Sequence, residues 1–297
     1  MSLGGSPEMP TVVIPAYNEE AIIGDCLRSV LRDSVHDLTV VVVPNACRDR
    51  TAEIARTFGD RVRVIETETP GKTNALNLAE EEANRTASPF PRAFIDGDIV
   101  LREGALAALF GTLTGGVHAA SPPPEFELTG SDLGVRLFYS SLRANDYFGK
   151  GAPNGSGVFA VTETGRARWG AFPKVIADDG FVERQFAPGE ARTSSGPGAV
   201  VRAPRTFSEL LAIKTRARLG KIELAARFPD LDRKVGSRAG RTYARMLASP
   251  RLWPAVPVYT VVRLVERRRA ARLAREEGFG GWLRDEGSRR SEASVGG

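Results

Sequence analysis

The sequence contains little cysteine, and this scarcity limits the classes of protein to which it can belong. Only Cys26 and Cys47 occur among 297 residues, which is too few for a disulfide framework and is typical of a reducing compartment. Cys26 shares a predicted helix face with Ile22, Ile23 and Val30, so we expect it to pack in a core. A disulfide-stapled small fold is therefore excluded.

Long apolar runs and targeting segments are also missing. No run of eighteen or more apolar residues occurs, and the amino terminus lacks a basic region followed by an apolar one, so neither a transmembrane helix nor a signal peptide is predicted. Residues 1–10 are small and polar and are expected to form a disordered leader. The chain is 42% hydrophobic and 26% charged, as in an ordinary globular protein. We expect a cytoplasmic location.

Positive charge is concentrated in one part of the chain. The formal net charge is +5, and six arginines crowd near the end, at positions 263, 267, 268, 269, 272 and 275. The sequence has no zinc-finger spacing, aromatic RNA-binding signature or helix-turn-helix pattern, so a nucleic-acid role would rest on charge alone. No nucleic-acid partner is therefore predicted.

Strand and helix patterns alternate from residue 11 onward. Apolar runs predict strands at 11–15, 38–43, 62–66 and 92–95, with helices between them. Asn18 and Asp49 are placed to begin the first two helices. Strands are also expected at 117–120 and 158–161, and helices at 103–113 and 135–148. Strands joined by crossover helices predict an α/β fold with a mainly parallel sheet flanked by helices.

Polar residues directly follow two of these strands. The first strand runs into VIPAYNEE at 13–20, and a later one into FIDGD at 94–98. Ligands bind at the carboxyl ends of the strands of an open α/β sheet, so both segments are expected to face one crevice. Asp96 and Asp98 point to the same side of an extended strand end, where both can reach one diphosphate and its Mg²⁺ or Mn²⁺. A solvated surface turn is the alternative.

These segments, in this order, resemble the family 2 glycosyltransferases, including bacterial enzymes of polysaccharide or natural-product synthesis. The similarity extends from residue 11 to about residue 220. It implies a GT-A fold, the fold of nucleotide-diphospho-sugar transferases. It also implies that the first segment lies near the base and ribose of the donor, which assigns donor contacts to Pro15, Ala16, Tyr17 and Glu19.

The resemblance also assigns the metal site. It implies that Asp98 is the chief ligand of Mn²⁺ or Mg²⁺. Asp96 is implied to lie near the ribose or the metal, and Gly97 to bind the donor. The segment PNACRDRT at 44–51 stands where many members carry two aspartates, a glycine and a serine. Asn45 thus replaces a base-contacting acid, but its carbonyl can still accept from N3–H of uracil, so UDP stays compatible and is less strongly specified.

Other implied donor contacts are basic. Lys72 falls where related enzymes place a basic residue near the nucleotide, and a solvated turn lysine is the alternative. A capping box, TFSE at 206–209, begins a helix that carries Arg216. Arg216 matches the arginine of the family's Gln-x-x-Arg-Trp motif, although Ile213 replaces the glutamine and Ala217 the tryptophan. An arginine there can stabilise the departing diphosphate, and a solvated helix face is the alternative.

The acceptor side is expected in the later part of the domain. NGSG at 154–157 precedes a predicted strand, and small residues there allow a substrate close to the backbone, so Asn154 and Gly155 are assigned to the acceptor. VIADDGF at 175–181 resembles the family's paired-acid motif. This implies Asp179 as the general base that deprotonates a sugar hydroxyl, with Asp178 on the acceptor side. Helix capping is the alternative for both acids.

The predicted catalytic domain covers 11–220, with a nucleotide-binding half at 11–101 and an acceptor half at 102–220. A basic helical extension is expected at 221–286 and a disordered tail at 287–297. The apolar stretch at 253–262 and the basic helix at 263–275 suit peripheral contact with the inner face of a membrane, and WLRD at 282–285 is similar to a closing stretch of related polysaccharide enzymes. A helix docked on the catalytic domain, with an arginine-rich outer face, is the alternative.

Three classes of function follow from these observations. The predicted one is a metal-dependent, inverting glycosyltransferase that uses a nucleotide-diphospho-sugar, with UDP-sugar favoured, and a carbohydrate, lipid-linked or small-molecule acceptor. A nucleotidyltransferase would need a glycine-rich loop with a following Arg or Lys after the first strand, and none is present. A degenerate protein that binds a nucleotide sugar or a membrane surface without transfer remains the alternative, because the second and last motifs are altered.

Overall fold

The computed structural model of the protein describes residues 10–33, 35, 37–144, 151–232, 239–276 and 278–279. The predicted tail, the WLRD stretch and residues 1–9 of the predicted leader lie outside this part of the chain. Pro10 is buried, and its carbonyl accepts a hydrogen bond from the backbone N–H of Thr39 at 3.1 Å, so this residue packs as part of the first unit.

The chain divides into two compact units, each assembled from separate segments. The first unit contains Met1–Glu125, Gly151–Pro173 and Pro188–Val201, and the second contains Phe126–Lys150, Lys174–Ala187 and Arg202–Gly297. This division follows spatial contacts, whereas the predicted boundary at residue 220 follows motifs. That boundary stays a prediction, and it falls inside a continuous helix, α8 (Phe207–Arg227).

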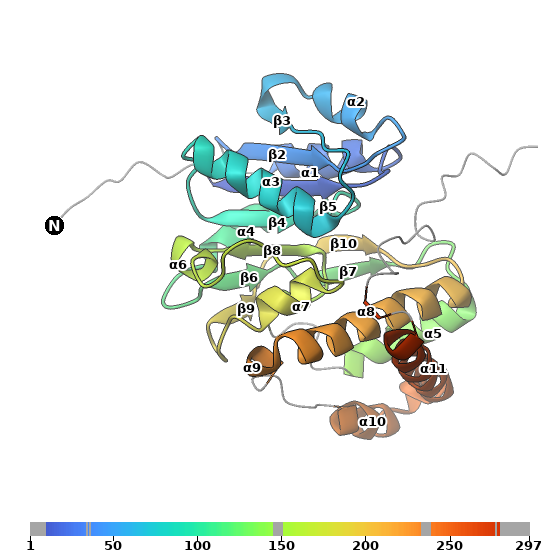
Figure 1. Ribbon diagram of the computed structural model, residues 1–297. Helices are drawn as coiled ribbons and strands as arrows, with labels where there is room; N and C mark the ends of the chain where they lie inside the picture. The colour runs from blue at the N-terminus through green and yellow to red at the C-terminus, as the bar shows by residue number, and fades with distance from the viewer. Residues whose placement is uncertain are drawn as a thin grey trace, which may run out of the picture. The chain divides into compact units, whose positions relative to one another are not determined.

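A seven-stranded sheet forms the centre of the first unit (Figure 1). Its strands, in spatial order, are β3 (Val62–Val64), β2 (Thr39–Pro44), β1 (Thr11–Ala16), β4 (Arg92–Ile95), β8 (Val158–Val161), β6 (Ala119–Ser121) and β9 (Ala191–Thr193). The pairs among β3, β2, β1 and β4 are parallel, as is β6 with β9, whereas β8 is antiparallel to both neighbours. The predicted mainly parallel α/β sheet is confirmed.

Helices cover the sheet because its central strands are apolar on both faces. The helices and turns of the first unit are α1 (Ile23–Arg32), α2 (Thr51–Arg56), η1 (Gly59–Arg61), α3 (Lys72–Arg85), α4 (Ala105–Gly111) and α6 (Glu163–Arg166). Every residue of β1 is buried, as expected of a central parallel strand. Val12 and Ile14 pack in one core cluster with Leu27 of α1 and Leu106 of α4. Figure 1 shows α3 lying along the sheet.

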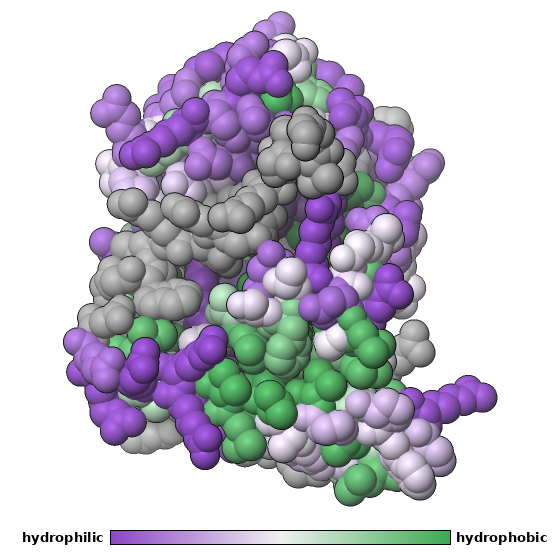
Figure 2. Space-filling model, turned by 90° about the vertical axis from the view of Figure 1, so that its right-hand side faces the viewer, coloured by the Kyte–Doolittle hydropathy of each residue, from purple (hydrophilic) through white to green (hydrophobic). Residues whose placement is uncertain are grey.

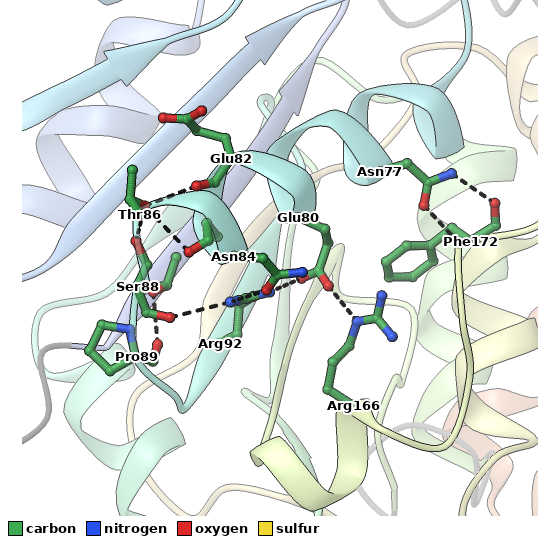
Figure 3. A network of polar contacts seen from close by, with 12 residues as sticks. Asn77, Glu80, Glu82, Asn84, Thr86, Ser88, Pro89, Arg92, Arg166 and Phe172 are labelled. Carbon is green, nitrogen blue, oxygen red and sulfur yellow. Dashed lines mark hydrogen bonds and ion pairs between the residues drawn. The ribbon is translucent and has the colours of Figure 1, made fainter.

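A buried ion-pair network joins α3 to β4 and α6 (Figure 3). Glu80 accepts from Arg92 Nη1 at 2.7 Å and from Arg166 Nε at 2.6 Å, and Arg92 is 1% exposed. Asn77 donates from Nδ2 to the carbonyl of Phe172 and accepts at Oδ1 from its N–H, at 3.0 and 2.7 Å. A buried carboxylate between two guanidinium groups meets the requirement that an interior charge be paired. The network therefore fixes α3, whose first residue is Lys72.

A second, three-stranded sheet has the order β5 (Val100–Leu101), β10 (Ala199–Arg202), β7 (Pro124–Glu127). Strand β5 pairs antiparallel with β10. Each strand has two to four residues, and none of the three was predicted from the sequence as a separate strand.

The second unit is helical. Its elements are α5 (Leu133–Ser141), η2 (Leu142–Ala144), α7 (Asp178–Glu183), α8 (Phe207–Arg227), α9 (Pro229–Asp232), α10 (Ala239–Leu247), η3 (Pro250–Leu252) and α11 (Ala255–Glu276). Its main core combines Phe138 of α5, Leu210 of α8, Met246 of α10, and Tyr259 and Val262 of α11. Within the described residues, no helix is both long and apolar enough to cross a membrane.

The predicted capping box at the start of α8 is confirmed. Thr206 Oγ1 accepts from the N–H of Glu209, and the Glu209 carboxylate accepts from the N–H of Thr206, both at 3.2 Å. Asp132 begins α5 in a similar way, by accepting from the N–H of Val135 at 2.8 Å. Its other oxygen accepts from the N–H of Phe207 at 2.6 Å, which ties the starts of α5 and α8 together.

Candidate functional site

Three parallel strands of the first unit end side by side. Ala16 at the end of β1 is in register with Pro44 at the end of β2, and β4 lies on the other side of β1, with Val13 opposite Phe94. The residues that follow these strands are Tyr17, Asn45 and Asp96. The segments at 13–20 and 94–98 therefore meet at the carboxyl edge of the sheet, as the sequence predicted, and the segment at 44–51 joins them there.

Gly97 fits against the first segment because it has no side chain. A Cβ at this position would lie 3.2 Å from Ala16 Cβ, 3.4 Å from the Pro15 carbonyl oxygen and 3.4 Å from Glu19 Cγ. Glu19 itself is 8% exposed. The structure thus brings Pro15, Ala16, Glu19 and Gly97, all predicted donor-binding residues, into direct contact.

The two acids on either side of Gly97 are accessible. Asp96 is half-buried and Asp98 is exposed. A turn shapes this segment, because the N–H of Asp96 donates to the Gly157 carbonyl at 2.9 Å and the Asp96 carbonyl accepts from the N–H of Ile99 at 3.1 Å. Gly157 has φ +70°, and a Cβ there would lie 2.9 Å from Ile99 Cγ1 and 3.2 Å from Asp96 Oδ2. Gly157 therefore gives the Asp96 carboxylate room.

Lys72 joins the acidic segment. Its Nζ lies 2.7 Å from Asp96 Oδ1, and the two side chains are 32% and 34% exposed. Lys72 is the first residue of α3, after Gly71 at φ +135°. The predicted basic residue and the first predicted acid thus form an ion pair that solvent can still reach.

Asn45 connects β1 to the start of α3. It is 5% exposed, its Nδ2 donates to the Ala16 carbonyl at 2.7 Å, and its Oδ1 accepts from the N–H of Gly71 at 3.1 Å. Both ends of the amide are therefore bonded within the protein. The carbonyl oxygen keeps a second lone pair, so a contact with a base stays a prediction.

The loops after β1 and β2 are bonded to each other, which sequence reasoning missed. The N–H of Glu19 donates to Thr51 Oγ1 at 2.7 Å, and that of Arg48 donates to Asn18 Oδ1 at 2.8 Å. Asn18 has φ +53°, and α1 begins five residues later, so the prediction that Asn18 caps that helix was wrong. Its side chain instead accepts the N–H of Arg48 in the other loop, a contact that no pattern in the sequence signals.

The two cysteines lie beside these loops. Cys26 is buried in the core, as predicted, and its Sγ lies 3.8 Å from the Asp96 carbonyl oxygen. Burial, followed by the charges of Asp98 and Asp96, raises the pKa of its thiol. Cys47 Sγ accepts from the N–H of Asn18 at 3.3 Å, and burial is the main cause that raises its pKa.

The NGSG loop is built around Asn154. This side chain is 1% exposed, donates to the Pro122 carbonyl at 3.0 Å and accepts from the N–H of Ser156 at 3.1 Å. Its observed contacts therefore hold the loop. Gly155 is exposed, with φ +78°, so its backbone can be approached. The acceptor role of both residues stays a prediction.

Asp178 and Asp179 begin α7 in the second unit. The cap residue is Ala177, which makes no side-chain cap, and the two acids occupy the first turn, where the helix dipole favours negative charge. Asp178 is 8% exposed and Asp179 is half-buried. Their place fits both the helix-start alternative and a catalytic role, and the general base stays a prediction.

Helix α8 holds the segment that leads into this acid pair. The N–H of Ile176 donates to the buried Glu223 carboxylate at 2.7 Å, and a Cβ on Gly220 would lie 2.7 Å from Ala177 Cβ. Arg216 is half-buried and lies one turn before Gly220, on the same side of the helix. Within the second unit, the predicted arginine, Arg216, therefore lies on the same helix that packs against the segment before the predicted base, Asp179.

Metal ligands within the described residues do not form a closed cage. No group of three or more His, Cys, Asp or Glu side chains that could hold a metal ion occurs there. Mg²⁺ is usually bound by one or two carboxylates together with substrate phosphates. Asp96 and Asp98 are accessible carboxylates on either side of one residue, so this donor set fits a divalent ion that a diphosphate completes.

The fold and the strand-end site define an α/β domain of the GT-A class. In structure, the chain is similar to the mannosyltransferase PcManGT from Pyrobaculum calidifontis in complex with GDP-Man and Mn²⁺, with a TM-score of 0.55 and 23% identity over 89% of this chain and 78% of that one. It is also similar to residues 1–349 of Staphylococcus aureus TarS, with a TM-score of 0.50 and 16% identity over 88% and 81% of the two chains. These likenesses confirm the predicted fold.

Residues 11–152, just under half of the chain, match the model of glycosyl transferase family 2. The predicted resemblance to this family is confirmed for that segment. Two bacterial relatives are also similar. They are an uncharacterized glycosyltransferase, EpsJ, of Bacillus subtilis, at 32% identity over 30% of this chain, and the 4,4'-diaponeurosporenoate glycosyltransferase of S. aureus, at 30% over 56%. The matches span 25% and 42% of these relatives' own lengths.

Proposed function

We propose that this protein is a hexosyltransferase-type glycosyltransferase, which moves a sugar from a nucleotide-diphospho-sugar to an acceptor hydroxyl. One observation carries the proposal. Lys72, Asp96 and the Gly97 contact with the first segment meet where β1, β2 and β4 end, so one cation and two accessible acids stand together at the expected donor position. The family match over 11–152 includes all of these residues and supports this assignment.

The proposed donor is a UDP-sugar. Tyr17 and Glu19 are assigned to the base and ribose, with Pro15, Ala16 and Gly97 lining the same edge. Asn45 is assigned to the base through its remaining lone pair, which can accept from N3–H of uracil. The similar mannosyltransferase structure contains GDP-Man, so guanine is the competing base.

Asp98, with Asp96, is proposed to hold Mn²⁺ or Mg²⁺. The hard oxygen donors of these accessible carboxylates suit either ion. The ion would neutralise diphosphate charge when bound. Lys72 and Arg216 are proposed to contact the diphosphate as well, since charge-assisted hydrogen bonds stabilise the negative charge that grows on a leaving group.

Asp179 is the proposed general base. It accepts the proton of the acceptor hydroxyl while that oxygen forms a bond to the anomeric carbon, and the bond from that carbon to the diphosphate oxygen breaks with its electron pair. A single displacement of this kind inverts the anomeric centre. Asp178, Asn154 and Gly155 are assigned to the acceptor, which is a carbohydrate, a lipid-linked sugar or a small molecule. Peripheral membrane contact through the basic α11 is a separate proposal, which does not depend on sugar transfer.

The alternative is a degenerate protein that binds a nucleotide sugar without transfer. It is favoured by the altered motifs, in which Asn45 bonds within the protein and Ile213 and Ala217 replace two motif residues. The two functions differ in turnover, so Asp179→Asn separates them. An enzyme keeps nucleotide binding and loses transfer, whereas a binding protein has no transfer to lose.

The test is calorimetric titration with UDP, GDP and dTDP, each with and without Mn²⁺. We expect metal-dependent binding of UDP that is lost in Asp98→Ala. The control is Asp60→Ala, which removes another exposed aspartate, in η1, and should retain binding. Tight binding of GDP alone would replace the proposed donor. Binding of none of the three nucleotides would overturn the proposal.

A further inference from the structure

The large apolar side chains that are strongly exposed are gathered in one unit. Among the described residues they are Leu133, Leu247, Trp253, Val261 and Leu264, and all five belong to the second unit. Figure 2 shows green, apolar side chains gathered in the lower part of the view. Contiguous exposed apolar surface on a protein usually marks an interaction site.

We call four of these side chains, on α10, α11 and the turn between them, the apolar face: Leu247, Trp253, Val261 and Leu264, which are 60%, 57%, 46% and 48% exposed. The indole Nε1 of Trp253 donates to the carbonyl of Leu247 at 3.0 Å, which places the two residues next to each other. Because the polar atom of the indole is bonded to a backbone carbonyl of the same chain, the rest of the ring presents apolar surface.

The exposed side of α11 is distinct from its packing side. Tyr259, Val262 and Ala270 are buried against the cores of the second unit, whereas Val261 and Leu264 lie one turn apart on the outer side. Residues other than Val261 and Leu264 therefore make the contacts of α11 with the cores. The two exposed residues lie on the side of the helix that faces away from those cores.

Arginines continue the same outer stripe. Arg268 and Arg272 follow Val261 by seven and eleven residues, a spacing that keeps them on the same side of a helix, and both are exposed. Arg267 precedes Arg268 and Arg275 follows Arg272 by three residues along α11, and both are also exposed. Glu276 lies 3.4 Å from Arg272 and offsets part of its charge. The stripe thus changes from apolar to basic along the helix.

We infer that the apolar face and these arginines dock on an anionic lipid bilayer surface. Trp253 and Leu264 would enter the boundary between headgroups and acyl chains, and Arg268 and Arg272 would contact lipid phosphates. An amphipathic surface with Trp and Leu beside arginines has the chemistry that such an interface requires. In a dimer formed through this surface, the arginines of the two copies would repel each other, whereas anionic lipid headgroups would attract them. Charge therefore favours lipid as the occupant. The inference does not depend on the proposed sugar transfer.

The test is co-sedimentation of the full chain with phosphatidylcholine vesicles, with or without phosphatidylglycerol. We expect binding only with the anionic lipid, and weaker binding as salt rises. Leu264→Ser, which removes no hydrogen bond, and Trp253→Ser/Leu264→Ser should weaken binding, the pair by about tenfold or more. Leu133→Ser, at a site 71% exposed on α5, should bind as the parent does.

A charge arm uses a matched pair of arginines. Arg268→Gln/Arg272→Gln should weaken binding about tenfold at low salt, whereas Arg28→Gln/Arg32→Gln, four residues apart on α1 of the first unit, should leave it unchanged. Thermal unfolding of each variant checks that it is folded. Equal binding to neutral vesicles, no binding to either kind, or equal losses in both arginine pairs would overturn the inference. So would a dimer that Trp253→Ser/Leu264→Ser turns into a monomer without a change in vesicle binding.

Discussion

The ammonium group of Lys72 lies 2.7 Å from Asp96 Oδ1, which joins the first residue of α3 to the residue that follows β4. About one third of each side chain is exposed, so neither charge is sealed from solvent. A partly exposed pair of this kind contributes little to stability. In the proposed function, the diphosphate of the donor would exchange this contact at the strand ends.

Replacing Lys72 tests that role. Lys72→Met should weaken UDP binding in the presence of Mn²⁺ about 10- to 100-fold, because one charge-assisted contact is lost. The free energy of unfolding should change by less than about 1 kcal/mol. Calorimetry and urea unfolding measure the two quantities, and Lys174→Met, at an exposed site, is the matched control. Unchanged affinity would remove Lys72 from the donor site.

The buried network of Figure 3 predicts a large stability effect. Glu80→Ala leaves Arg92, which is 1% exposed, and Arg166 without their shared carboxylate, and should lower the free energy of unfolding by about 3–5 kcal/mol. Glu81→Ala changes the neighbouring, exposed acid and should cost less than about 0.5 kcal/mol. Urea unfolding compares them. Similar losses in both variants would show that the buried pairing is not the cause.

Close packing at Gly220 predicts a defect in the acid pair. Gly220→Ala puts a Cβ 2.7 Å from Ala177 Cβ, so the segment before Asp178 must shift, at a cost of about 1–3 kcal/mol. If Asp179 is the base, kcat should fall while KM for the donor stays within about twofold, since the shift acts on proton transfer.

The control for this variant is another helical glycine. Gly111 ends α4, and a Cβ added there would meet no atom within 4 Å, so Gly111→Ala should keep activity and match or exceed the parent's stability by up to about 1 kcal/mol. Steady-state kinetics and thermal unfolding test both variants. Normal kcat in Gly220→Ala would separate this packing contact from catalysis.

Lys214 predicts a pH dependence of stability. Burial lowers its pKa from 10.5 to about 8, and the nearby charges of Lys221 and Arg263 act in the same direction while Glu266 opposes it. The unfolded chain therefore binds more protons between these values, and the free energy of unfolding should rise as pH increases from about 8 to 10.5. Below pH 8 the cost of holding this charge in the folded protein is fully present.

Lys214→Met should remove this rise and stabilise the protein at pH 7 by about 1–3 kcal/mol. Urea unfolding at pH 7, 8.5 and 10 measures the difference from the parent, and Lys174→Met supplies the comparison at an exposed lysine. The Tyr139 hydroxyl, whose pKa burial raises to about 12, acts in the opposite direction only above pH 10. A rise of the same size in both lysine variants would refute the assignment.

The central strands were predictable because they are the most apolar runs in the sequence. β1, β2, β4 and β8 were placed within one or two residues, and the parallel pairing of β1, β2 and β4 followed from the helices between them, whereas the order of the strands in the sheet was not predicted. Strands β5, β7, β9 and β10 have two to four residues, too few to show a period in the sequence. They become strands because neighbouring segments in the fold pair with them. The helix expected at 135–148 begins at Leu133, and α5 ends at Ser141.

The sequence by itself determined which residues stand at the carboxyl ends of parallel strands, because apolar runs and intervening helices leave few topologies. It therefore placed Pro15, Asp96 and Gly97 at one edge. Only the tertiary structure decided how their polar atoms are used. Both ends of the Asn45 amide form hydrogen bonds, to Ala16 and Gly71. Lys72 pairs with Asp96, and Val261 and Leu264 on the outer side of α11 are exposed. Hydrogen-bond partners and exposure depend on which segments meet in space, and spacing along the chain does not record those meetings.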